Sequence, residues 1–212
     1  KYFYFFNKNN YYFYPKAELE KILLDKFPRI KKLEFSGKNN ILTITTISRE
    51  PKYMWCHEAE DFCQYLDGEG VALGLAPKFS GETLLVFSPA SSSTPVTVLG
   101  ASPFISDDFV KLTNLINDLK VTLKNSSFTA YNVKKVFVLN GGDYKVEFIS
   151  NSQKIFPLNL TVGINNSIQS TISYLKSVFS SPEFKASLLL SSKPLKNLDL
   201  RFNQKVFYEF WE

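Results

Sequence analysis

The chain has 212 residues, enough for one large domain or two small ones. Hydrophobic residues make up 44% and charged residues 21%, and the 20 Phe and 11 Tyr favour β-sheet because aromatic side chains pack well on a pleated surface. The formal net charge of +5 is mild, and the lysines form no basic stripe of the kind that nucleic-acid-binding proteins carry, so we expect no nucleic-acid partner.

The chain opens at Lys1 with an aromatic run over residues 2–6. Such a run suits either a membrane interface or a buried strand. It is too short to span a bilayer, and no stretch of the sequence reaches the roughly 18 apolar residues of a transmembrane helix.

A helix is predicted from Pro15 to Phe27, because proline suits a first helical turn and the apolar residues that follow recur at helical spacing. Pro28 ends it, since the residue before a proline is pushed out of the helical region. Two strands are predicted next, at residues 31–35 and 41–47, joined by a Gly/Asn-rich turn that indicates a hairpin.

Beyond residue 50 the pattern changes to short strands joined by turns, with a Ser/Pro-rich surface loop expected over residues 88–102. Two amphipathic helices interrupt them, one capped by Ser106 and one by Ser167, the second ending before Pro182. The strands expected here lie at residues 52–56, 62–66, 71–73, 96–99, 133–139, 144–149, 155–162, 186–190, 195–202 and 205–210. The predicted fold class is therefore α+β, with a small mixed module followed by a mostly antiparallel sheet carrying two helices.

Residue types that carry catalysis are sparse. The single histidine, His57, adjoins Cys56, and neighbouring side chains in a strand point to opposite faces. Two cysteines and one histidine also fall short of a closed four-ligand zinc site. The paired glycines at 141–142 are typical of a hairpin turn, and no phosphate-binding glycine motif occurs. We therefore expect no catalytic, cofactor-binding or metal-binding residues and no small-molecule substrate.

Cys56 and Cys63 lie near the facing ends of two predicted strands, with six residues between them. Residues across such a hairpin can reach the Cα separation that a disulfide requires, and a disulfide would indicate an oxidising compartment. Two buried free thiols are the alternative.

Several motifs, taken in order, resemble the FtsQ/DivIB family of bacterial cell-division proteins. Residues 27–35 followed by 41–44 resemble the second half of a POTRA module, in which a helix leads to Pro-x-Ile and two strands. Residues 48–51 resemble the family's closing Glu-Arg-x-Pro, although Ser48 stands where glutamate is usual. Further similar positions are Trp55, the Asp-Gly hairpin at 65–72, Leu99-Gly100 and the closing Asp-Leu-Arg-aromatic hairpin at 198–207.

The resemblance covers residues 27–210 and implies two domains: a POTRA-like module over residues 1–50 and an FtsQ-type β-domain over residues 51–212. Only fourteen residues precede the first predicted helix. The first strand of the module is therefore expected to be truncated, replaced or supplied by residues 2–6.

The resemblance also implies a non-enzymatic scaffold at the division septum. The chain would lie outside the cytoplasmic membrane, anchored by a single span before Lys1, and would bind the coiled-coil partners FtsB and FtsL. A partner strand could add to an exposed edge of the closing hairpin. The partner-binding residues expected there are Arg201, Phe202, Gln204, Val206 and Phe207.

Each of these assignments has an alternative. Arg201 could instead form an internal ion pair with Asp199, and Phe202 could be a core residue. For the whole chain, the alternatives are a POTRA-bearing module of a secretion or outer-membrane assembly system, or an unrelated secreted or surface binding protein.

Overall fold

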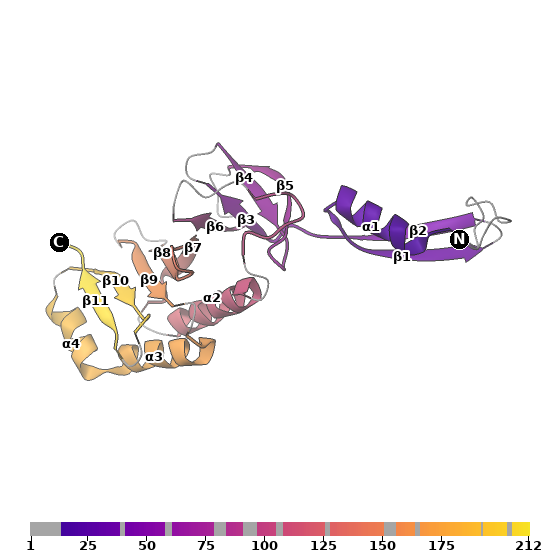
Figure 1. Cartoon of the computed structure of the whole chain (residues 1–212). Helices are drawn as coiled ribbons and strands as arrows, with labels where there is room; N and C mark the ends of the chain where they lie inside the picture. Colours follow the sequence, from indigo (N-terminus) through magenta and orange to yellow (C-terminus); the bar gives the residue numbers. More distant parts are fainter. Residues whose placement is uncertain are drawn as a thin grey trace.

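The computed structural model describes residues 14–38, 41–57, 61–78, 84–90, 97–104, 108–125, 128–150, 156–163, 166–191, 193–202 and 205–212. The predicted N-cap Ser106, the aromatic run at 2–6 and the predicted partner-binding residue Gln204 lie outside these residues. The described chain is α+β, as predicted. Figure 1 shows a small helix–hairpin unit beside a larger layered body of one sheet and three helices.

The small unit contains helix α1 (Lys16–Lys26) and the antiparallel strands β1 (Ile30–Lys38) and β2 (Ile41–Ser48). The helix and hairpin agree with the prediction, except that both strands are longer and pair as far as Lys38↔Ile41. Few side chains of this unit are buried. Leu33 is the one buried side chain in these three elements, and Tyr14 stacks on Phe35 with ring centroids 6.0 Å apart.

The larger body is built on a nine-stranded sheet with the order β11-β10-β9-β8-β7-β6-β3-β4-β5. Five neighbouring pairs are antiparallel, and three pairs, β3–β6, β6–β7 and β9–β10, are parallel, so the sheet is mixed. Its strands are β3 (Tyr53–Cys56), β4 (Phe62–Leu66), β5 (Ala72–Pro77), β6 (Leu85–Pro89), β7 (Tyr131–Val138), β8 (Tyr144–Ser150), β9 (Leu158–Val162), β10 (Leu195–Asp199) and β11 (Phe207–Phe210).

Three helices cover one face of this sheet: α2 (Asp108–Lys124), α3 (Ile168–Ser180) and α4 (Pro182–Leu190) (Figure 1). The strands alternate accordingly, because successive side chains point to opposite faces. In β8, for example, Tyr144, Val146 and Phe148 are buried while the residues between them are partly exposed. The apolar stripe predicted for α2 is buried as expected: Phe109, Leu112, Leu115, Ile116 and Leu119.

The sequence-based prediction of a strand at residues 186–190 is wrong, since these residues form the second half of α4. Ser181 caps this helix by accepting a hydrogen bond from the Phe184 amide at 3.0 Å, and Pro182 occupies its first turn. Proline at that position begins a helix as readily as it follows one. Helix α3 ends at Ser180, before Pro182 as predicted, and Pro182 then starts a third helix over the sheet.

The predicted loop at 88–102 also needs correction. Ser88 and Pro89 belong to β6, and the Ser88 hydroxyl is fully buried, donating to the Cys56 carbonyl at 2.6 Å. The brief strand expected at 96–99 is absent from its described residues, Thr97–Leu99. β6 was not predicted at all, and it lies in the middle of the sheet between β3 and β7.

The two cysteines are joined in the structure. Cys56 pairs directly with Cys63 across the β3–β4 hairpin, with Cα atoms 4.3 Å apart in a disulfide. His57 is buried on the opposite face from Cys56, and its Nε2 atom accepts a hydrogen bond from the Trp55 indole at 3.0 Å. Both side chains are therefore occupied by structural contacts.

The junction between the small unit and the large sheet is an ion-pair network centred on Arg49. The Arg49 guanidinium donates to Asp67 at 2.5 Å and to Glu69 at 2.9 Å, and Lys31 of β1 binds Glu69 at 2.6 Å. The Asp67 side chain is buried and also accepts hydrogen bonds from the backbone amides of Glu69 and Val71. The turn after β4 thus holds the end of the small hairpin.

We expect Arg49→Met to destabilise the protein by about 1–3 kcal/mol, because it removes a charged donor from the buried Asp67 carboxylate. Urea unfolding at neutral pH measures this change. Lys32→Met is the control, since Lys32 pairs with Glu34 where both side chains are more than half exposed. An Arg49→Met midpoint equal to that of the control would contradict a structural role for the network.

The double substitution Cys56→Ala/Cys63→Ala is expected to lower the free energy of unfolding by about 2–3 kcal/mol, since it frees a short loop in the unfolded chain. Thermal unfolding of the oxidised protein and of the variant gives the comparison. Adding reductant should shift the oxidised protein toward the variant and leave the variant unchanged. A transition insensitive to both changes would exclude stabilisation by this disulfide.

Candidate functional site

The sheet has two edge strands in the described structure, β5 and β11. β11 pairs with β10 on one side only, with Leu198 opposite Tyr208 and Asp199 opposite Phe207. An edge strand presents unpaired backbone N–H and C=O groups to solvent, to which another strand can bind. Figure 1 shows β11 at the end of the sheet far from the small unit.

The side chains of β11 divide between the two faces of the sheet. Tyr208 points to the helical side, where its ring lies 5.3 Å from the Phe184 ring and its hydroxyl lies 3.2 Å from Ser187 Oγ. On the other face Glu209 accepts a hydrogen bond from Lys196 at 2.8 Å. These contacts hold the strand in register, while Phe207 and Tyr208 stay 55% and 43% exposed.

An aromatic pair extends the exposed surface beyond the strand. The rings of Phe202 and Phe207 meet edge to face with centroids 5.2 Å apart, and Phe202 is 48% exposed. The Arg201 guanidinium lies 5.6 Å from the Phe202 ring centroid. Exposed aromatic side chains beside an unpaired strand supply the large contact area that dominates protein–protein interfaces.

Arg201 is engaged within its own chain. Its Nε and Nη2 atoms donate to the Asp199 carboxylate at 3.0 and 2.6 Å, and Nη1 lies 3.5 Å from Asp143, the residue before β8. Burial raises the pKa of Asp199, but the hydrogen bonds and charge of Arg201 outweigh it and leave that pKa below its ordinary value. The internal pair with Asp199 is therefore formed in this structure, and the arginine fixes the chain that leaves β10.

The structure brings together four of the five residues predicted to bind a partner, and Gln204 lies outside the described residues. Phe202 and Phe207 are exposed, so Phe202 is not a core residue. Val206 is half-buried and packs against the core, so it supports β11 from within. Tyr208 was not predicted as part of this surface. Tyr208 follows Phe207 and points to the opposite face of the strand. The sequence could have placed Tyr208 at the binding surface only if β11 had been known to be an edge strand.

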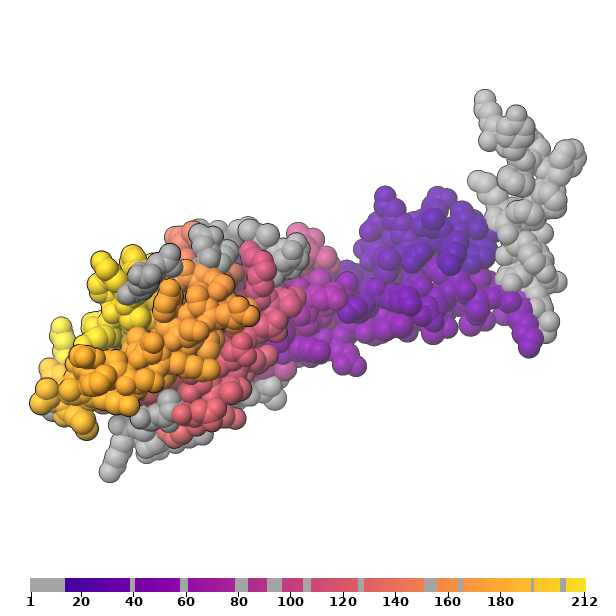
Figure 2. Space-filling view, turned by 90° about the horizontal axis from the view of Figure 1, so that it is seen from below, coloured from indigo at the N-terminus to yellow at the C-terminus, as the bar shows by residue number. Residues whose placement is uncertain are grey.

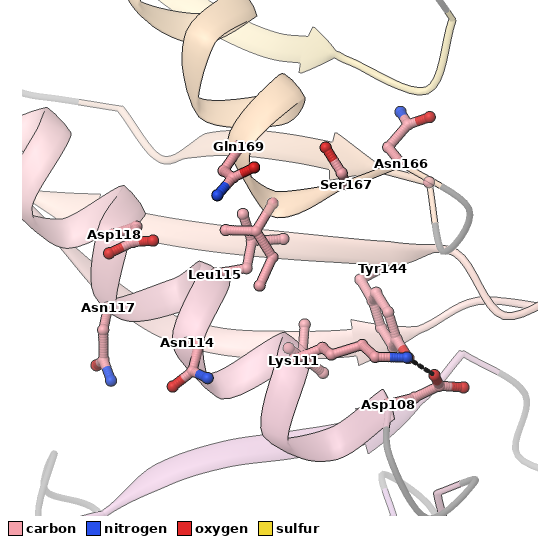
Figure 3. Close-up of a pocket in the computed structure, with 13 residues that line it drawn as sticks. Asp108, Lys111, Asn114, Leu115, Asn117, Asp118, Tyr144, Asn166, Ser167 and Gln169 are labelled. Carbon is pink, nitrogen blue, oxygen red and sulfur yellow. Dashed lines mark ion pairs between the residues drawn. The ribbon is translucent and has the colours of Figure 1, made fainter.

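A separate groove of about 760 Å³ lies between the start of α2 and the start of α3 (Figure 3). Its lining mixes apolar side chains such as Leu115 with polar ones, among them the Asp108–Lys111 pair at 3.6 Å on α2 and the amides of Asn114 and Gln169 on the two helices. Tyr144 forms part of the groove, and burial raises its pKa to about 12. The phenol is therefore neutral at physiological pH and can act as a hydrogen-bond donor.

The groove carries no recognisable catalytic arrangement. Its lining contains neither the histidine nor a cysteine, and of its two carboxylates Asp108 is paired with Lys111 while Asp118 lies further along α2. In the part of the chain that the structure describes, no group of three or more His, Cys, Asp or Glu side chains could hold a metal ion. The β11 edge is the stronger candidate site, because there exposed aromatic side chains coincide with unpaired backbone groups.

No family model matches the chain, and no curated protein matches it. Within the described residues, no helix combines the length and apolar character needed to cross a membrane.

Arg201→Gln is expected to raise the pKa of Asp199 toward the ordinary value of about 3.9, because it removes the partner that stabilises the carboxylate. NMR titration of the Asp199 side chain measures this pKa directly. The folded pKa is depressed, so the pair stabilises the protein above pH of about 4, and that contribution is lost as the pH falls through the folded pKa. The stability difference from the unsubstituted protein should be about 0.2–1 kcal/mol at pH 7 and vanish in acid.

Lys205→Gln is the matched control, since it removes an equal charge two residues before β11 and Lys205 has no ion pair with any described residue. It should leave the Asp199 pKa unchanged. An unchanged pKa in Arg201→Gln as well would show that the pair does not form in solution.

Proposed function

We propose that this protein is a non-enzymatic scaffold of the bacterial division machinery, of the FtsQ/DivIB type, that binds partner proteins by strand addition at β11. The observation that carries the proposal is the exposed edge of β11 with Phe202, Phe207 and Tyr208 around it. A partner strand placed there would satisfy the unpaired backbone groups and cover the aromatic rings. Backbone pairing would supply affinity, and the side-chain contacts would supply specificity.

The order of elements supports the same proposal. A helix followed by an antiparallel hairpin, as α1 and β1–β2 form here, supports the assignment of a POTRA-like module, and the Asp-Leu-Arg-aromatic motif lies at the end of β10 beside the exposed edge. In this proposal residues 1–50 form the membrane-proximal module and residues 51–212 the partner-binding β-domain. The partners would be the extracytoplasmic segments of FtsB-like and FtsL-like proteins.

The disulfide supports a location outside the cytoplasm. Disulfides persist in oxidising compartments and are rare in the cytosol, so the Cys56–Cys63 bond suits a chain held on the extracytoplasmic side of the cell membrane. In the proposed arrangement a single span before Lys1 anchors the chain at the division septum.

Phe207→Lys should weaken binding to the FtsB-like and FtsL-like segments from the same source by at least about tenfold, because it places an unpaired charge on the edge strand. Phe202→Ala should weaken binding in the same direction. Calorimetry with the purified chain measures both affinities. Phe207 and Phe202 are about half exposed, so both variants are expected to fold.

Leu75→Lys is the matched control, because Leu75 is 63% exposed on the opposite edge strand, β5. It should bind like the unsubstituted protein. Loss of binding in Leu75→Lys alone would move the interface to β5. Absence of binding by the folded, unsubstituted chain would refute the proposed partners.

A further inference from the structure

A second groove, of about 570 Å³, lies on the helical side of the molecule between α2, α3 and α4. Figure 2 looks onto this side, where α3 and α4 lie alongside α2. The groove is separate from the exposed edge of β11, and none of the residues considered above as partner-binding lines it. Its lining is Val121, Thr122, Asn125, Phe128, Lys176, Phe179, Ser180, Phe184, Lys185 and Leu188.

The floor of this groove is apolar. Phe179 of α3 lies between Phe128 and Phe184, with ring centroids 4.9 and 6.1 Å away. Val121 of α2 is 58% exposed at one wall, and Leu188 of α4 is half-buried at the other. Val121 and Phe179 thus leave apolar surface in contact with water. Burying such surface against a partner is favourable by roughly 25 cal/mol per Å².

The rim of the groove is basic. Lys176 and Lys185 line it from α3 and α4, and both are exposed. Neither lysine makes an ion pair with another described residue. Lys120 and Lys124 flank Val121 along α2 and are likewise exposed. The lining itself contains no carboxylate, so the groove combines an apolar floor with a positively charged rim.

We propose that this groove binds an acidic amphipathic helix of a partner protein. The walls are helices, whose backbone groups are already paired within each helix, so an added strand would find no hydrogen-bonding edge here. A helix can instead lay its apolar face on Phe179 and Val121, as helices do in hydrophobic grooves. Acidic residues along its flanks would then face Lys176 and Lys185.

Leu189 extends this surface. It follows Lys185 by four residues in α4, so the two side chains lie on the same face of that helix. Leu189 is 86% exposed, which continues the apolar floor past Leu188 toward the end of α4. A docked helix of two to three turns can therefore contact apolar side chains from all three helices.

A direct test uses a fluorescein-labelled 21-residue peptide with leucines on one helical face and glutamates on the other. A matched peptide carries lysines in place of the glutamates. Fluorescence polarisation with the intact chain should show binding of the acidic peptide, and weaker binding at higher salt because the contacts are partly electrostatic. The basic peptide should not bind.

Two kinds of variant locate the site. Lys176→Glu/Lys185→Glu should weaken binding of the acidic peptide at least about tenfold, because it reverses the charge of the rim. Lys21→Glu/Lys38→Glu changes the net charge equally in the small unit and should bind like the unsubstituted chain. Val121→Asp should abolish binding, whereas Val110→Asp, at the 44% exposed valine near the start of the same helix, should not.

Equal binding of the two peptides, or binding that survives both Val121→Asp and the Lys176/Lys185 reversal, would overturn the proposal. So would the absence of binding at peptide concentrations up to about 1 mM. If Phe207→Lys alone removed binding, the peptide would occupy the β11 edge and the groove proposal would fail. Failure of the groove leaves strand addition at β11 untouched, because the two sites share no residue.

Discussion

The rest of the structure depends on the packing of Phe109, whose side chain lies between the helical layer and the middle of the sheet. Its ring centroid lies 4.6 Å from that of Phe104, 5.2 Å from Phe87 and 5.3 Å from Tyr53. Tyr53 and Phe87 belong to neighbouring parallel strands, β3 and β6, so one side chain of α2 bridges the line where the two halves of the sheet meet. Gly70 completes the fit, because a Cβ atom there would lie 2.8 Å from Phe109 Cγ.

This packing explains how a sheet with three parallel joints stays together. The β3–β4–β5 meander and the β7–β8–β9 meander are each joined by local antiparallel hairpins, but β6 joins the two meanders only through parallel pairs. Parallel pairs are slightly weaker per residue and need a crossover connection. Helix α2 supplies the crossover from β6 to β7, and its buried face covers the joint. The edge strand β11 therefore belongs to a sheet whose two halves are held together by the packing of α2 on its central strands.

Elements with a clear period and recognisable ends were predictable from the sequence. The stripe from Phe109 to Leu119 and the Ser167 cap identify α2 and α3, and the glycines at 141–142 adopt positive φ in the β7–β8 turn. β6 could not be found this way, because a short buried strand shows no alternation and Ser/Pro residues follow it. The candidate site was predictable only in part. Phe202 and Phe207 could be named, but whether β11 is an edge depends on the order of the strands, and the helical groove depends on how three helices meet.

From β7 to β11, every strand lies in the sheet beside the strand that precedes it in the chain. The β7–β8, β8–β9 and β10–β11 pairs are local hairpin-like contacts, which favour rapid folding, whereas the β6–β7 and β9–β10 pairs are joined across helices. The β3–β6 pair is the one sheet contact that skips strands. The sheet can therefore grow outward from β6 in single steps, each new strand pairing with the edge left by the last. Strand addition by a partner at β11 would repeat that step with a separate molecule. Binding of a partner strand at this edge would then resemble a further step of folding, in which the entropy cost of bringing two chains together replaces that of closing a loop.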